Sequence, residues 1–109
     1  MRMRFLAVPA WLGLFSPALA DAPSFFEPFE TLDMERWYIS DGWSNGDHQS
    51  CLWSSENVRH VDNRIDLVLN DTPRKDRPFS CGELQSVAFY GYGTYEVRMK
   101  AAPAHSGMV

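Results

Sequence analysis

Glu83 is the acidic residue whose neighbours best suit a chemical role. It lies two positions after Cys81, so a disulfide at that cysteine would fix its backbone, and an extended chain places it on the same face as Gln85. Hydrolysis of a glycosidic bond requires two carboxyl groups, about 5–5.5 Å apart for retention or about 6.5–9.5 Å for inversion. No second acid forms a local pattern with Glu83, because Glu96 falls among the charges of another segment and Glu27 fits an ordinary surface position. Glu83 is therefore a candidate without a visible catalytic partner.

Trp43 is the aromatic residue most suited to ligand binding. It lies in the loop Asp41-Gly-Trp-Ser-Asn-Gly46, whose turn-forming composition makes a large ring hard to bury. A ring held on a loop can stack on the apolar face of a sugar while polar side chains bind the hydroxyls. Composition leaves one alternative open, in which Trp43 covers the edge of the core.

The histidines do not indicate a metal centre. None of His48, His60 and His105 has a histidine or cysteine at ligand spacing. The sequence also has no G-x-S-x-G, no phosphate-binding glycine loop and no H-E-x-x-H motif. We therefore expect no cofactor for catalysis.

Short β-strands must position these residues. Residues 92–100 alternate, with Tyr95, Val97 and Met99 on one face and polar side chains on the other, as in a half-buried strand. Residues 64–69 place an isoleucine and two leucines on one face in the same way. The pattern predicts an all-β fold of short antiparallel strands.

The other segments fit this architecture. Residues 82–90 also read as extended, and no window has the apolar stripe of a helix. Residues 33–38 allow one helical turn with Asp33 as its N-cap. Residues 71–80 are polar with two prolines, which predicts a surface connection.

The first twenty residues have the layout of a secretory signal peptide. A basic start precedes the apolar run Phe5–Phe15, and Ala18-Leu-Ala20 provides the small residues of a cleavage site before Asp21. The alternative, a membrane anchor, requires about 20 apolar residues. We therefore expect residues 1–20 to be removed and residues 21–109 to be secreted or periplasmic, with no membrane attachment.

The exported part is acidic and contains two cysteines. Residues 21–109 hold 8 basic and 14 acidic side chains, a net charge of −6. Nucleic-acid binding requires a basic face, so we expect no nucleic-acid partner, and an uncharged ligand fits better. We also expect a monomer. In an oxidising compartment, Cys51 and Cys81 favour a disulfide worth about 3 kcal/mol, although two free buried thiols are the alternative.

Five motifs in order resemble one known family. The resemblance is to the N-terminal half of bacterial endo-1,3-1,4-β-glucanases, the lichenases of glycoside hydrolase family 16, and to exported rhizobial endo-β-glycanases that trim succinoglycan. It covers residues 24–109. The motifs are Ser24-Phe-Phe-Glu-Pro-Phe29, Asp41-Gly-Trp-Ser-Asn-Gly46, Cys51-Leu-Trp53, Cys81-Gly-Glu-Leu-Gln-Ser86 and Tyr90-Gly-Tyr-Gly-Thr-Tyr-Glu-Val-Arg-Met-Lys100.

The resemblance implies a concanavalin-like jelly-roll β-sandwich with a substrate cleft on its concave side. By position, Trp43 matches a cleft tyrosine, Asn45 a sugar-binding asparagine and Glu83 a substrate-binding glutamate. Gln85 stands where lichenases carry arginine, a departure that removes a charge from the cleft. The implied partner is a β-glucan or an exopolysaccharide.

The resemblance also implies features beyond the binding residues. It pairs Cys51 with Cys81, and it places a structural calcium partly on backbone oxygens near Pro28, with the remaining ligand in the far C-terminal part of the family's domain. The catalytic glutamates of the family lie on a later strand, Trp-Asp-Glu-Ile-Asp-Ile-Glu-Phe, where they perform a retaining double displacement. The sequence stops at Val109, at a position that resembles the approach to that strand, so the expectation is a truncated sandwich with no catalytic residue.

Three functions follow from these patterns. In the first, residues 21–109 are the N-terminal part of the catalytic domain of an endo-β-glucanase. In the second, the chain is an inactive truncated product. In the third, it is a non-catalytic carbohydrate-binding module that uses the surface around Trp43, Asn45 and Glu83.

Overall fold

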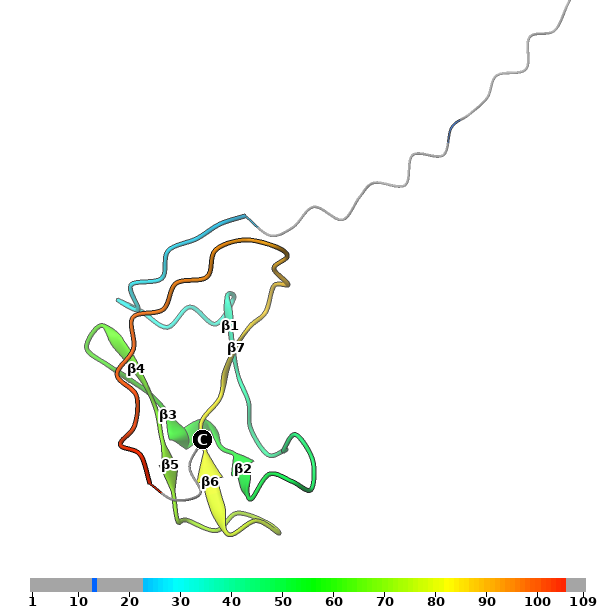
Figure 1. Cartoon of the computed structure of the whole chain (residues 1–109), viewed down its shortest axis with the longest axis vertical. Coiled ribbons are helices and arrows are strands. Elements are labelled where there is room, and N and C mark those ends of the chain that lie inside the picture. The colour runs from blue at the N-terminus through cyan, green and yellow to red at the C-terminus, as the bar shows by residue number, and fades with distance from the viewer. Residues whose placement is uncertain (1–12, 14–22, 106–109) are drawn as a thin grey trace, which may run out of the picture.

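Seven short strands form three small β-sheets. The computed structural model describes residues 13 and 23–105, and within them the strands and one short 3₁₀ helix, η1, are the regular elements (Figure 1). This confirms the predicted all-β class. The bounds are β1 Trp37–Ile39, β2 Cys51–Trp53, η1 Ser55–Asn57, β3 Val58–Val61, β4 Arg64–Leu67, β5 Leu69–Asn70, β6 Phe79–Cys81 and β7 Leu84–Ser86.

Strands β1 and β7 form an antiparallel pair. Tyr38 lies opposite Gln85, and Ile39 lies opposite Leu84. Beyond the end of β1, the Ser40 N–H donates to the carbonyl of Glu83 at 3.2 Å. The pairing therefore brings the start of the Trp43 loop beside the segment that contains Glu83.

Strands β2, β6 and β5 form the second sheet, in that order. Strand β6 is parallel to β2, with Trp53 opposite Cys81, and antiparallel to β5. The prediction of antiparallel strands is therefore wrong for the β2–β6 pair. A disulfide joins Cys51 to Cys81, whose Cα atoms are 5.8 Å apart and whose positions are 30 residues apart in the sequence. The predicted disulfide is thereby confirmed.

Strands β3 and β4 form a hairpin between β2 and β5 in the sequence. Val61 pairs with Arg64 across a two-residue turn, in which Asp62 has φ 51°. Aspartate is among the residues that tolerate this left-handed conformation, so the Asp62-Asn63 sequence favours a tight reversal here.

Few side chains are fully buried in the described part of the chain. Asn57, 3% exposed, donates through Nδ2 to the carbonyls of Val68 and Ser80 at 3.0 and 3.1 Å. These bonds satisfy a buried amide and tie η1 to β6 and to Val68, which lies between β4 and β5. The buried apolar side chains are Leu52, Val58 and Cys81.

The prediction of one strand over residues 64–69 is wrong in two respects. The strand is interrupted at Val68, whose N–H donates to the Asn57 carbonyl at 2.8 Å and whose carbonyl accepts from the Gly82 N–H at 3.0 Å. Strands β4 and β5 therefore belong to different sheets. The two leucines of the predicted apolar face are 56% and 45% exposed.

The prediction of a half-buried strand over residues 92–100 is also wrong. No strand within residues 23–105 pairs with this segment, and Tyr95, Val97 and Met99 are 67%, 79% and 75% exposed. Alternation produces a strand only where a neighbouring strand supplies hydrogen-bond partners. The segment follows β7 as an irregular extended chain, drawn in orange to red in Figure 1.

Three smaller predictions have mixed outcomes. Within residues 82–90 only β7 is a strand. Asp33 caps a turn over residues 34–36, because its Oδ1 accepts from the Glu35 N–H at 2.9 Å, but the chain then enters β1 at Trp37. The segment from Asp71 to Pro78 is the predicted surface connection, and it leads into β6.

The predicted signal peptide lies outside the described residues, apart from Gly13. Among the described residues, no helix combines the length and the hydrophobicity needed to cross a membrane.

Glu27 attaches the N-terminal segment to β1 and is not the ordinary surface acid that the sequence indicated. Its carboxylate accepts from the Phe29 N–H, the Arg36 guanidinium and the Trp37 indole at 2.9, 3.0 and 3.0 Å. The Trp37 bond is the main cause that lowers the pKa of Glu27, with the Phe29 and Arg36 bonds adding to it and burial opposing it. The bonds therefore favour the ionised form.

We expect Glu27 to make the fold sensitive to acid. Because its pKa is lowered on folding, its contribution is complete above the ordinary value of 4.5 and is lost as the pH falls through the lower folded-state pKa. Replacing Glu27 with glutamine should lower the free energy of unfolding at neutral pH by about 1–2 kcal/mol. Urea unfolding of the full-length protein at about pH 7 and about pH 3.5 measures this. Glu30→Gln, at an exposed position, is the control; equal acid sensitivity of parent and Glu27→Gln would contradict the expectation.

Candidate functional site

A polar group forms where β1 ends and β7 begins. The Ser40 hydroxyl donates to Glu83 Oε1 at 2.5 Å. The Gln85 amide donates to the same Oε1 at 2.5 Å and to Ser40 Oγ at 3.3 Å. Ser40 is fully buried, whereas Glu83 is half-buried and Gln85 is exposed. The predicted Glu83 and Gln85 are thus brought together, with a serine beneath them.

These bonds fix the orientation of the Glu83 carboxylate. Both donors use Oε1, and no described residue donates to Oε2. An ionised carboxylate accepts several hydrogen bonds, so Oε2 is available to a hydroxyl of a bound ligand. Gln85 also retains its amide oxygen as an acceptor, which makes the group suited to binding a polyol.

An aromatic group forms on the loop that follows Ser40. The rings of Trp43 and Trp53 meet edge to face, with centroids 6.4 Å apart and planes at 72°. The Trp53 indole N–H lies 3.5 Å from Asn45 Oδ1, a long hydrogen bond, and its backbone N–H donates to the Trp43 carbonyl at 2.9 Å. Trp43 is 37% exposed. Trp43 therefore packs against a neighbour on one side and still presents ring surface to solvent.

The two groups share one structural base. Ser40 immediately precedes the Trp43 loop. Trp53 lies opposite Cys81 in the sheet, and Cys81 comes two residues before Glu83 in the sequence. The Cys51–Cys81 disulfide joins these two strands. The sequence could place Trp43, Asn45, Glu83 and Gln85 only on separate segments. The fold links these segments through the backbone, since the Ser40 N–H donates to the Glu83 carbonyl and the Gly42 N–H donates to the Trp53 carbonyl.

An open hollow of about 430 Å³ lies next to Gln85. Its wall includes Phe89, Tyr90 and Tyr95, and Tyr90 is held by the Phe25 ring at 5.4 Å between centroids. Aromatic rings beside an amide are a common composition for sugar contacts.

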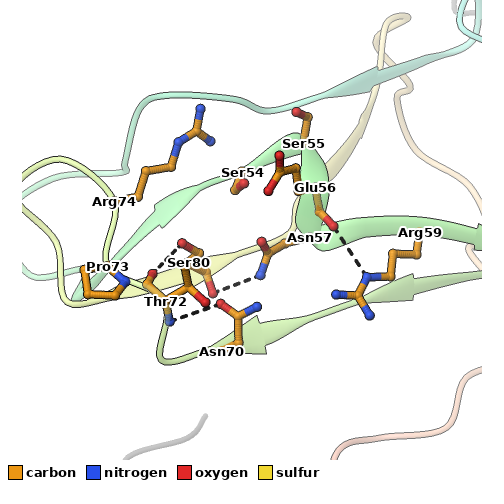
Figure 2. A pocket seen from close by; sticks show the side chains of 10 residues that line it. All are labelled: Ser54, Ser55, Glu56, Asn57, Arg59, Asn70, Thr72, Pro73, Arg74 and Ser80. Carbon is orange, nitrogen blue, oxygen red and sulfur yellow. Dashed lines mark hydrogen bonds between the residues drawn. The ribbon is translucent and has the colours of Figure 1, made fainter.

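A second pocket, of about 310 Å³, lies between η1 and the start of the loop after β5 (Figure 2). Its wall contains none of the four predicted binding residues. Several of its polar side chains are already bonded within the chain: Asn57 to the Ser80 carbonyl, Ser80 to the Thr72 carbonyl, and Arg59 to the Glu56 carbonyl. We therefore interpret this pocket as part of the framework that holds the loop after β5.

The structural calcium that the resemblance places on backbone oxygens near Pro28 stays a prediction. The carbonyl of the neighbouring Phe29 lies 2.7 Å from His60 Nε2, within hydrogen-bond distance, and the Glu27 carboxylate is engaged as described above. Among residues 13 and 23–105, no three His, Cys, Asp or Glu side chains converge as metal ligands.

Sequence reasoning missed two members of the site. Ser40 gave no signal, because a serine after a short strand is common. Trp53 was part of a recognised motif, but its contact with Trp43 depends on the pairing of the loop with β2. The sequence offered only their positions as an indication: Ser40 precedes the Asp41-Gly42 turn, and Trp53 lies two residues after Cys51.

Known proteins share this chain's sequence over most of its described length. The family model described as glycosyl hydrolases family 16 matches residues 45–109. The chain is 49% identical over 79 residues to endo-1,3-1,4-beta-glycanase ExoK of Rhizobium meliloti (strain 1021), covering 72% of this chain and 29% of that protein. It is 46% identical over 79 residues to a beta-glucanase of Bacillus amyloliquefaciens, covering 72% of this chain and 33% of that protein.

A solved structure has a similar arrangement of strands. It is the crystal structure of a prokaryotic beta-1,3-1,4-glucanase (lichenase) derived from a mouse hindgut metagenome, 31% identical, with a TM-score of 0.58 over 62% of this chain and 32% of that one. The chain thus spans about a third of the length of the relatives that it matches.

Proposed function

Since the chain belongs to glycosyl hydrolase family 16, we propose that the whole protein is an exported endo-β-glucanase that hydrolyses internal β-1,3/1,4-glycosidic bonds of a polysaccharide. The relatives reported above are named as β-glucanases or β-glycanases. The observation that supports this most directly is the oriented carboxylate of Glu83, held by Ser40 and Gln85 at the base of an exposed tryptophan loop. The signal-peptide layout of residues 1–20 supports export.

The described residues would bind the substrate. In this proposal the exposed part of the Trp43 ring stacks on a sugar, and Glu83 Oε2 accepts a hydrogen bond from a hydroxyl. Asn45 and Gln85 supply amide groups to further hydroxyls. A neutral glutamine at position 85 and the acidic balance of residues 21–109 fit an uncharged glucan better than an anionic polymer.

The reaction itself would use residues outside this chain. A retaining hydrolase needs a nucleophilic carboxylate and an acid/base carboxyl group about 5–5.5 Å apart. Glu83 Oε1 accepts hydrogen bonds from Ser40 and Gln85, which fits a carboxylate that binds a ligand through Oε2. We therefore assign binding to this chain and bond cleavage to the remainder of the domain.

Assay of the full-length protein tests the proposal. We expect lichenan to be cut internally, with oligosaccharides and new reducing ends as products, and NMR should show the β-anomer first because of retention. Laminarin and succinoglycan are the comparison substrates, and N-terminal sequencing of the exported protein should begin at Asp21. No reducing ends from any of the three polysaccharides would reject hydrolysis; calorimetric binding of glucan oligosaccharides in that case would support a carbohydrate-binding module.

A further inference from the structure

Three basic side chains on one short turn point at the loop that carries Trp43. The turn Arg74-Lys75-Asp76-Arg77, here called the cationic turn, is closed by two backbone hydrogen bonds between Arg74 and Arg77, at 2.9 and 3.1 Å. Lys75 has φ 53°, a conformation that is unfavourable for a residue other than glycine. Such non-glycine outliers persist where surrounding contacts hold them, and they often mark functional segments.

Arg74 connects the start of the loop to β2. Its Nη1 donates to Asp41 Oδ1 at 2.6 Å and to the Trp53 carbonyl at 3.0 Å. Asp41 Oδ1 also accepts from the Ser55 N–H at 2.9 Å. The Arg74 guanidinium, followed by Ser55, holds the pKa of Asp41 well below its ordinary value, so this contact stays ionic at the pH of most assays.

Lys75 and Arg77 reach the next part of the loop. Lys75 Nζ donates to the Gly42 carbonyl at 2.9 Å. Arg77 Nη2 donates to Ser44 Oγ at 3.2 Å and to the Gly46 carbonyl at 3.4 Å. The Arg77 side chain is only 16% exposed, so solvent screens these contacts less than those of an open surface pair.

The contacted positions leave the proposed binding residues free. The cationic turn bonds to residues 41, 42, 44 and 46, whereas none of its hydrogen bonds involves the side chain of Trp43 or Asn45. Gly42 and Gly46, with φ 80° and 128°, flank these two residues. Glycine restricts the backbone dihedral angles little, so the loop needs contacts from outside to remain in one conformation.

We propose that the cationic turn positions the loop 41–47 so that Trp43 and Asn45 are preorganised for sugar binding. The expected effect on substrate binding rests on the proposed function. The claim that the cationic turn holds the loop 41–47 in one conformation does not. The residues of the turn are positioning residues, because they act through the loop. Preorganisation lowers the ordering cost of binding, so its loss should weaken substrate affinity more than it slows the chemical step.

The test uses the full-length protein with Arg77→Ala and with the triple variant Arg74→Ala/Lys75→Ala/Arg77→Ala. Hydrogen exchange of peptides covering residues 41–49 should become faster by on the order of tenfold, while exchange in β2 and β6 stays the same. KM for lichenan should rise about tenfold with kcat changed less than about twofold. Arg59→Ala is the matched control, because this exposed guanidinium makes only a 3.5 Å contact to the Glu56 carbonyl.

A conservative variant distinguishes positioning from general loss of structure. Both contacts of Arg74 use one nitrogen, so Arg74→Lys should retain most of the parental KM and exchange rate, whereas Arg74→Ala should not. Unchanged exchange of residues 41–49 in the triple variant would overturn the inference, whatever the activity. Faster exchange with an unchanged KM would overturn its link to substrate binding. An inactive parent protein would reject the proposed function and leave the exchange result to decide the structural part.

Discussion

The Glu83→Gln variant of the full-length protein should lose about 100-fold in kcat/KM on a β-glucan. A hydrogen bond to a charged group contributes about 1.5–3 kcal/mol, and about 2.7 kcal/mol corresponds to 100-fold. Glutamine retains an oxygen that can accept from Ser40 and Gln85. It places an NH₂ group where Oε2 would otherwise accept from the substrate, so the change removes the proposed sugar contact and keeps the shape of the site.

Initial rates across a range of lichenan concentrations measure this effect. Glu35→Gln, an exposed acid in the turn before β1, is the matched control and should behave as the parent protein. Urea midpoints of the two variants should agree closely, because the amide oxygen introduced by Glu83→Gln still accepts from the buried Ser40 hydroxyl. Parental kcat/KM in Glu83→Gln would rule out a role for this carboxylate in substrate binding.

The double variant Cys51→Ala/Cys81→Ala should lower the free energy of unfolding of the full-length protein by about 3–4 kcal/mol. The bridge spans 30 positions, and closing a loop of that length removes this much entropy from the unfolded chain. Cys81 is buried and lies two residues before Glu83, so the site junction should be affected along with global stability. Denaturant unfolding of parent and variant under oxidising conditions gives the difference.

Reduction provides the control for the cysteine variant. Unfolding of the parent in dithiothreitol should approach that of the double variant, which should itself be insensitive to the reductant. A loss below about 1 kcal/mol would show that the bridge does not constrain the unfolded chain as the loop-closure model requires.

Local patterns in the sequence predicted the parts of this site that depend on neighbours in the chain. The turn-rich composition placed Trp43 on a loop, and the two-residue spacing placed Glu83 and Gln85 on one side of an extended segment. Cysteine number and export predicted the Cys51–Cys81 bridge. The family match and the likeness to the solved lichenase confirm the resemblance and the jelly-roll class, of which this chain covers part.

Features that depend on contacts distant in sequence could not be predicted in the same way. Ser40 lies 43 positions from Glu83, and Arg74 lies 33 positions from Asp41. Residues 71–80 read as a surface connection because they are polar and contain two prolines, and this composition does not identify a partner for their basic side chains. The same limit explains the 92–100 segment, since alternation specifies which side chains share a face but not whether another strand is adjacent.

The parallel pairing of β2 with β6 determines where this chain tolerates changes in length. The excursion between the two strands includes the β3–β4 hairpin, whose Asp62-Asn63 turn makes no hydrogen bond to the loop 41–47. Loop-closure entropy grows only logarithmically, by about 0.6 kcal/mol for each doubling of loop length, so insertions at this turn would cost little. Insertions within the cationic turn would separate Arg74 from Arg77 and misplace the contacts to residues 41–46. The segment between β2 and β6 therefore contains one turn, Asp62-Asn63, where insertions should be tolerated. It also contains the cationic turn, whose length is constrained by its contacts with the loop 41–47.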